Sequence, residues 1–197
     1  MLGFFIMKKI LYLLIPILLF LNCKKEREKI ELDFSPEMKA KLEASKQLIL
    51  SKEKDTYQIS NGSKTPNEAI QNFLTKAIQE TNYNNNPFLF TEQEKLDVLY
   101  PNVYGSGTSL DVTPIEDYER LIDNLTRSGY EKTHSKMKSI HKNPRFEIRF
   151  QSPRQYKNIQ GLKPKVVVYS NGKVLEFEEI KMVFKVGNLY KVGVLAP

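Results

Sequence analysis

The sequence predicts an α+β domain in which helices pack on a curved antiparallel sheet. Apolar residues recur with a helical period up to about residue 129, and after Pro144 they alternate with polar residues as in strands. Because the helices come first and the strands follow, the order favours an α+β fold over an alternating α/β fold. The chain of 197 residues is long enough for one such domain, a targeting segment and a tether.

Residues 1–22 are predicted to be a signal peptide. Met7-Lys8-Lys9 precede an apolar run at residues 10–21. This run is shorter than the roughly 20 apolar residues that a bilayer span requires, but it suits the hydrophobic region of a signal peptide. Translation from Met1 would place two lysines inside an apolar segment, so we expect Met7 to be the natural start.

Cys23 follows this run directly and is the only cysteine in the chain. Residues 21–23, Leu-Asn-Cys, resemble the cleavage box of bacterial lipoproteins, in the relaxed spirochaete form because Asn22 replaces the usual Gly or Ala. The resemblance implies export, cleavage before Cys23 and attachment of lipid to its sulfur in the cell envelope. Lys24, where an aspartate would retain the protein at the inner membrane, favours the outer membrane. The alternative is an uncleaved anchor helix with an incidental cysteine.

Residues 23–63 are predicted to form a tether and a stalk helix, and residues 64–197 the α+β domain. The tether, residues 24–34, is rich in charges of both signs and poor in apolar residues. Ser35-Pro36 matches an N-cap followed by proline at the first helical position, which predicts a helix to Lys52. Its thin apolar stripe fits either a stalk or an edge helix of the domain.

Three further helices are predicted by capping boxes that begin at Thr65, Thr91 and Thr113, each with a glutamate three residues later. The first box opens a helix with a broad apolar face. The second opens a short helix that we expect to end before Pro101, and the third a helix that we expect to end at Gly129.

Strands are predicted from residue 145 onward. Residues 145–151 alternate between apolar and polar side chains, and residues 165–170 are β-branched and aromatic. Asn171-Gly172 then predicts a hairpin turn.

The strand predicted at residues 173–186 changes its apolar phase at Glu178-Glu179. A strand that keeps one buried face needs an inserted residue at such a point, so we predict a β-bulge there. Gly187-Asn188 predicts a second hairpin, and residues 190–194 the last strand.

Residues 64–197 resemble the NTF2-like (cystatin-like) superfamily in their element order, the Thr-Pro opening of the first helix and the bulged strand. The resemblance implies that an enzyme of this fold would place a carboxylate and a tyrosine inside the cone of the sheet. The candidate pocket residues are Tyr118, Tyr169, Glu178, Glu179 and Tyr190. The alternative is that these tyrosines edge the core and the glutamates face water.

The composition limits the chemistry. One cysteine excludes an internal disulfide, and two histidines provide too few ligands for a usual zinc site, so we expect no metal and no cofactor. His134 and His141 are expected to be exposed. Gly105-Ser106-Gly107 lacks the third glycine and the lysine of a phosphate loop, which favours a plain loop. The sequence offers no catalytic residue and favours a role other than catalysis.

Basic residues are concentrated between residues 130 and 165, where ten lysines and arginines stand against two glutamates. This excess favours an anionic partner, and the alternative is a solvated basic face. The residues predicted to form the patch are Lys136, Lys138, Lys142, Arg145, Arg149 and Arg154.

We therefore expect a membrane-anchored envelope lipoprotein with a binding or accessory role. Its expected partners are membrane lipid through acylated Cys23 and, through the basic patch, an anionic glycan, lipid head groups or an envelope protein, but not nucleic acid. The alternatives are a small NTF2-like enzyme that uses a pocket carboxylate and a tyrosine, and a structural surface lipoprotein without a small ligand.

Overall fold

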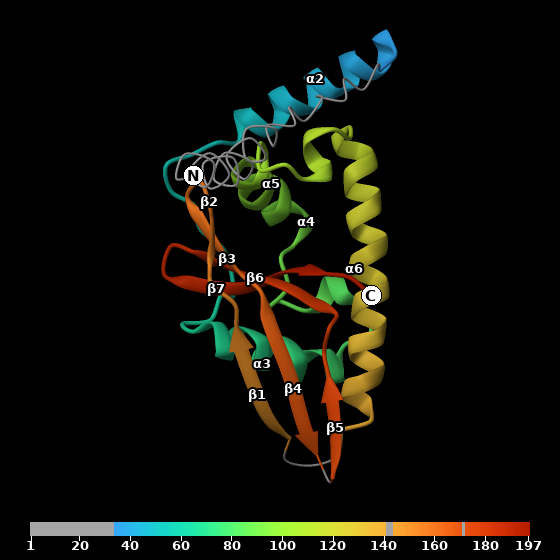
Figure 1. Ribbon diagram of the computed structural model, residues 1–197, viewed down its shortest axis with the longest axis vertical. Coiled ribbons are helices and arrows are strands. Elements are labelled where there is room, and N and C mark those ends of the chain that lie inside the picture. Colours follow the sequence, from blue (N-terminus) through green and yellow to red (C-terminus); the bar gives the residue numbers. More distant parts are fainter. Residues whose placement is uncertain (1–33, 141–143, 171) are drawn as a thin grey trace, which may run out of the picture. The chain divides into compact units, whose positions relative to one another are not determined.

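The structure is a computed structural model that describes residues 34–140, 144–170 and 172–197 (Figure 1). The predicted signal peptide, Cys23, the tether at residues 24–33, His141 and Lys142 lie outside the described residues. Ser35–Pro197 form one compact unit with helices and two antiparallel sheets, which confirms the α+β class. The expected single curved sheet is replaced by two separate ones. Among the described residues, no helix combines the length and apolar content that crossing a membrane requires.

Helix α2, Pro36–Ser51, begins as predicted, with the Ser35 side chain accepting a hydrogen bond from the backbone N–H of Met38. Ile49 on this helix is fully buried. The Ser45 Oγ accepts a hydrogen bond of 2.9 Å from the backbone N–H of Ile115. The helix is therefore an edge helix of the compact unit, the second of the two possibilities that the sequence left open.

The first two capping boxes are confirmed. Helix α3, Pro66–Gln79, starts with reciprocal hydrogen bonds of 3.2 Å between Thr65 and Glu68, and the 3-10 turn η1, Tyr83–Asn85, follows it. Helix α4, Glu92–Glu94, starts with the same arrangement between Thr91 and Glu94.

The helix that starts at Thr91 does not end before Pro101 as predicted. It continues through a π-helical segment η2, Lys95–Leu99, into helix α5, Tyr100–Val103. Pro101 has no backbone N–H to donate to the preceding turn. Next to it, the buried Asn102 side-chain amide donates to the Val98 carbonyl oxygen at 2.7 Å.

Helix α6, Ile115–Lys138, follows the short 3-10 turn η3, Ser109–Asp111, and corrects two predictions. Its N-cap is Pro114 without a side-chain hydrogen bond, so the box predicted at Thr113 is not formed, and Ser45 satisfies the Ile115 N–H instead. Gly129 lies inside the helix rather than at its end. A Cβ there would come within 2.9 Å of the Ala196 backbone nitrogen, so the glycine allows the C-terminal strand to approach closely.

The strands form two antiparallel sheets that run in different directions in Figure 1. One has the order β1-β4-β5 and contains β1 (Arg145–Phe150), β4 (Pro164–Ser170) and β5 (Lys173–Glu176). The other has the order β2-β3-β6-β7 and contains β2 (Arg154–Tyr156), β3 (Ile159–Leu162), β6 (Ile180–Val186) and β7 (Leu189–Leu195). The pairing of β4 with β5 and of β6 with β7 confirms both predicted hairpins, whereas β2 and β3 were not predicted.

The strand predicted over residues 173–186 is divided between the two sheets, and the bulge expected at Glu178-Glu179 is a turn. Phe177 remains buried there, and its backbone N–H donates to the Val166 carbonyl oxygen at 3.0 Å. The change of apolar phase therefore marks a change of sheet. A register irregularity does occur, but farther along, between Ile180 and Val183 in the pairing of β6 with β7.

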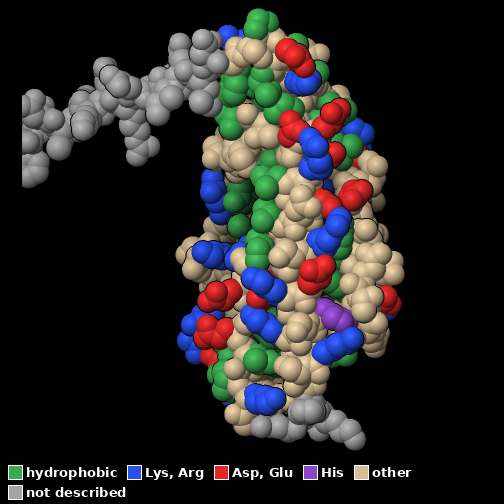
Figure 2. All heavy atoms as spheres, turned by 90° about the vertical axis from the view of Figure 1, so that its right-hand side faces the viewer, with side chains coloured by type: hydrophobic (Ala, Val, Ile, Leu, Met, Phe, Trp, Pro, Cys, Tyr) green, Lys and Arg blue, Asp and Glu red, His purple; other side chains and the backbone are tan. Residues whose placement is uncertain are grey.

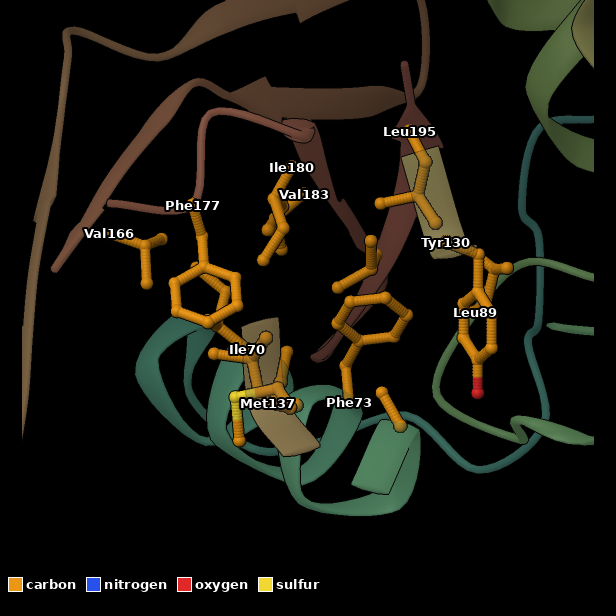
Figure 3. Packing of buried hydrophobic residues seen from close by; sticks show 14 of the residues in the cluster. Ile70, Phe73, Leu89, Tyr130, Met137, Val166, Phe177, Ile180, Val183 and Leu195 are labelled. Atoms are coloured by element: carbon orange, nitrogen blue, oxygen red, sulfur yellow. The ribbon is translucent and has the colours of Figure 1, made fainter. Parts of the chain in front are cut away.

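Two apolar clusters hold the unit together. The larger joins α3 and α6 to strands of both sheets, and Figure 3 shows Ile70 and Phe73 of α3 directed toward Val183 and Phe177. The smaller cluster includes Ile49 of α2 and residues of η2, α5, β3 and β6.

Candidate functional site

The outer face of the β1-β4 pair carries basic side chains. Arg145, Glu147 and Arg149 alternate along β1, and Arg149 lies opposite Lys165 on β4. The Arg145 guanidinium lies 4.6 Å from the centre of the Tyr169 ring. Arg149 forms an ion pair of 2.6 Å with Glu147. Arg145 and Arg149 thus share one exposed face, but Glu147 between them offsets part of its charge.

The Glu147 carboxylate is held in its charged form by its neighbours. The Tyr169 hydroxyl donates to it at 3.0 Å, and together with Arg149 this lowers the pKa of Glu147. The same hydrogen bond raises the pKa of Tyr169. Tyr169 is therefore a phenol engaged on the outer face of the sheet rather than a group inside a pocket.

A groove of about 400 Å³ lies beside this face, where the chain passes from β3 to β4 and from β5 to β6. Its basic side chains are Lys163, Lys165 and Lys181, and its acidic ones are Glu176 and Glu178. Buried Val166, Phe177 and Ile180 also line it. The groove lies where the chain crosses between the two sheets, and all three crossings contribute to it, because Gln151 follows β1, Lys163 precedes β4 and Phe177 follows β5.

Two of the groove lysines are exposed and available. The side chains of Lys163 and Lys165 make no hydrogen bond or ion pair with any residue that the structure describes. The Lys181 Nζ donates to the Pro197 carbonyl oxygen at 3.3 Å. With Arg149 opposite Lys165, the groove offers several cationic donors to an anionic group.

The other predicted patch residues do not join this surface as one patch. Lys136 pairs with buried Glu179 at 2.6 Å and donates to the Glu176 carbonyl oxygen at 2.8 Å. Lys138 is exposed at the end of α6. Arg154 belongs to the other sheet and donates to the Ser106 carbonyl oxygen at 3.2 Å. Lys142 lies outside the described residues.

The predicted tyrosines of the pocket lie apart from one another. Tyr118 on α6 packs edge-to-face against Tyr100, with ring centres 5.5 Å apart, and burial raises its pKa. Tyr169 lies on the outer sheet face, and Tyr190 on β7 has the Lys185 ammonium 5.8 Å from its ring centre.

The two predicted glutamates also differ in their surroundings. Glu178 is exposed at the edge of the groove. Glu179 is 5% exposed, and its Oε1 is held by Lys136 while its Oε2 has no hydrogen-bond partner in the described structure. No tyrosine lines the groove, so the five candidate residues are not brought together in one pocket as the resemblance implied.

The glycine loop at residues 105–107 binds a carboxylate of the chain itself. The backbone N–H groups of Gly105, Gly107 and Thr108 donate to the Asp111 side chain at 2.7, 2.7 and 3.2 Å. Its donors are therefore occupied.

The histidine expectation needs one correction. His134, expected to be exposed, is half-buried, and its Nδ1 lies 2.6 Å from the Ala77 carbonyl oxygen. Within the described ranges, no three His, Cys, Asp or Glu side chains are grouped so that they could hold a metal ion.

Of the candidate site residues that were predicted from the sequence and that the structure describes, only Glu178 lines one of the two hollows described here. Lys163 and Lys165 belong to the basic run but were not chosen, and Lys181 lies beyond it. A second hollow, of about 320 Å³, is bordered by Lys95, a buried lysine between α4 and α5. No protein-family model, curated protein or solved structure matches the chain, so its function must be argued from this geometry.

Proposed function

We propose that the chain is an envelope lipoprotein, anchored through acylated Cys23 in the outer membrane, whose domain binds an anionic partner at the groove between its two sheets. The observation that carries the binding role is the pair Lys163 and Lys165, exposed and unpaired among the described residues, next to Arg149. The Leu-Asn-Cys box at residues 21–23 supports the anchor.

The partner is a molecule with anionic groups on its surface, such as a glycan, a lipid head group or an acidic envelope protein. A domain tethered to a membrane meets such groups at a high effective concentration, so weak ionic contacts suffice. Each lysine near an anionic surface contributes about 1 kcal/mol, and salt weakens this contribution.

A relationship to the NTF2-like superfamily is part of the same proposal. It is supported by the helix that opens at Thr65-Pro66 and by helices that precede a set of antiparallel strands. One feature differs from the superfamily's single bent sheet: the turn between β5 and β6 carries the chain from one sheet to the other, so the strands form two sheets.

Binding is tested with the mature chain carrying Cys23→Ser, measured on vesicles with and without anionic lipid and on a sulfated glycan surface. The double variant Lys163→Ala/Lys165→Ala removes about 2 kcal/mol and so weakens binding roughly thirtyfold at low salt. The comparison between the two surfaces distinguishes a lipid from a glycan partner.

The matched control is Lys46→Ala/Lys64→Ala, which removes the same charge elsewhere. Lys46 is exposed on α2, and Lys64 is exposed next to Ser63, which pairs with Tyr190 at the far end of the β6-β7 hairpin. Equal weakening by both double variants, or none by either, would remove the groove from the proposal.

The anchor is tested separately by labelling cells with radioactive palmitate. The wild-type chain incorporates the label and Cys23→Ser does not. Equal labelling of the two would refute acylation at Cys23 and leave the groove proposal intact.

A further inference from the structure

Lys95 is a buried lysine without a partner. Its side chain is at the start of the π-helical segment η2, and the residue is only 3% exposed. No described residue forms a hydrogen bond or an ion pair with its Nζ. Burying an amine without a partner costs free energy, so the stability of the fold does not explain why a lysine occupies this position.

The Lys95 side chain borders a hollow of about 320 Å³, a size that suits a small molecule. The hollow lies between the α4-η2-α5 segment and the first half of α6, toward the end of the unit opposite the β1-β4-β5 sheet in Figure 1. The Lys95 Nζ and the Tyr100 hydroxyl are not among the unpaired side-chain atoms that the described residues enclose completely. Because both residues line the hollow, these two atoms are open to it.

The remaining border of the hollow is mainly acidic. Glu92 contributes from α4, and Glu116, Glu119 and Asp123 contribute from α6. Figure 2, which faces α6, shows acidic side chains interspersed with basic ones along this side. Arg120 is the other basic group at the hollow.

Several of these charges already have partners. Arg120 pairs with Asp117. Asp123 accepts from the Tyr83 hydroxyl and pairs with Arg127 at 2.7 Å. Glu92 and Glu119 form no ion pair with any residue in the described ranges, so they remain available to a cationic group.

The surroundings of Lys95 shift its ionisation toward the neutral amine. Burial lowers the pKa of Lys95, and this effect outweighs the opposing influence of Glu92, Asp123 and Glu119. Burial also raises the pKa of Glu119, with a further contribution from Glu92. A lowered pKa increases the fraction of the amine that is neutral at a given pH, and the neutral amine is the nucleophile toward a carbonyl carbon. Desolvation is a known way to lower the pKa of a lysine.

We propose that Lys95 is the nucleophile of a second site, which takes a small aldehyde or ketone bearing a positive charge and binds it as an imine. The unpaired Nζ, which opens into the hollow, supplies the electron pair, and Glu92 and Glu119 attract the cationic group. The position in a π-helical segment agrees with this role, because such segments are frequent at functional sites.

The step balances without an oxidant or reductant. The Lys95 Nζ lone pair forms a bond to the carbonyl carbon, and the electron pair of the C=O π bond moves to oxygen, which takes up a proton. The nitrogen loses one proton to give the carbinolamine, the hydroxyl takes up a second proton and leaves as water while the C=N bond forms, and the nitrogen then loses its remaining proton. The Tyr100 hydroxyl borders the hollow and can relay a proton from the nitrogen to the leaving hydroxyl.

The test uses three small aldehydes that differ in charge: betaine aldehyde (cationic), glycolaldehyde (neutral) and glyoxylate (anionic). The mature chain carrying Cys23→Ser is incubated at pH 7 with each aldehyde and cyanoborohydride, which reduces an imine to a stable amine. Peptide mass spectrometry then gives the labelled fraction of each lysine, with exposed Lys64 as the internal reference.

We expect Lys95 to be labelled several-fold more than Lys64 by betaine aldehyde, with the order cationic, neutral, anionic. Lys95→Arg abolishes the label at that peptide. Glu92→Gln/Glu119→Gln keeps labelling by glycolaldehyde but loses the preference for the cation, and thermal unfolding verifies that both variants are folded. Labelling of Lys95 at or below that of Lys64 with all three aldehydes overturns the nucleophile, and labelling without the charge order overturns the cationic ligand.

Discussion

Two buried lysines of this domain, Lys191 and Lys95, are held in opposite ways. The Lys191 Nζ on β7 donates to the Glu94 carboxylate at 2.8 Å and to the Ser60 carbonyl oxygen at 3.0 Å. Lys95 is adjacent to Glu94 in the chain, yet the described structure gives its Nζ no such contact. Lys191 is thus a paired charge that fixes the fold, whereas Lys95 carries a buried amine that the described residues leave unpaired.

Glu94 shows how the paired case is stabilised. Burial by itself would raise the pKa of this carboxyl group, but the hydrogen bonds from Lys191 and from the Thr91 and Ser60 backbones lower it. One side chain thereby joins the start of α4, the segment before α3 and strand β7. This contrast teaches that burial alone does not identify a functional lysine, and that the missing partner does.

The largest expected effect is that of breaking the paired lysine. Glu94→Ala leaves the Lys191 ammonium buried with only the Ser60 carbonyl oxygen, and it removes the acceptor for the Ser60 and Thr91 N–H groups. We expect the free energy of unfolding in urea to fall by about 3–5 kcal/mol. Glu43→Ala, which removes an exposed ion pair with Lys46, is the control and costs less than about 1 kcal/mol. A similar loss of unfolding free energy in Glu94→Ala and Glu43→Ala would contradict the claim that the buried pair of Lys191 and Glu94 stabilises the fold.

The second effect is a loss of stability in acid that depends on Glu94. Its folded pKa is below the ordinary value of 4.5, so its contribution is complete above pH 4.5 and is lost as the pH falls through the folded pKa. Unfolding in urea at pH 7, 5 and 3 should show the difference between wild type and Glu94→Gln shrinking at pH 3. A difference that stays constant over this range would rule out Glu94 as the origin.

The smallest expected effect is that of removing the unpaired lysine. Lys95→Met replaces a buried amine without a partner by an apolar side chain of similar length. The free energy of unfolding should therefore fall by less than about 1 kcal/mol, or rise. The wild type should gain stability as the pH rises toward 10.5, because its unfolded chain binds the additional proton, and Lys95→Met should lose this gain. A loss comparable to that of Glu94→Ala would show that Lys95 has a structural role.

Local signals in the sequence predicted the elements that depend on local contacts. The boxes at Thr65 and Thr91 and the two hairpins need only residues a few positions apart, and all four are formed. The box at Thr113 failed because a distant side chain, Ser45, satisfies the helix end. The prediction of a helix end at Gly129 is wrong for the same reason: the glycine is explained by a close contact with Ala196, which is distant in the chain.

The hollows were harder to predict. The phase change at Glu178-Glu179 indicated an irregularity, but period alone does not distinguish a bulge from a change of sheet, and the groove is formed by the latter. A signal for Lys95 was present in the sequence. It precedes Val98 and Leu99 by three and four residues, so it occupies an apolar position of the helix, and all three are buried. The π-helical segment and the missing partner require the structure.

The most direct measurement is an NMR titration of the Lys95 side chain in the folded protein, with lysine labelled at Cε and the signal assigned by Lys95→Arg. The account predicts a midpoint below the ordinary lysine value of 10.5, since burial without a partner disfavours the ammonium form. A midpoint at or above 10.5 would mean that Lys95 is charged and paired in solution, which would contradict the difference from Lys191 and the proposed nucleophile.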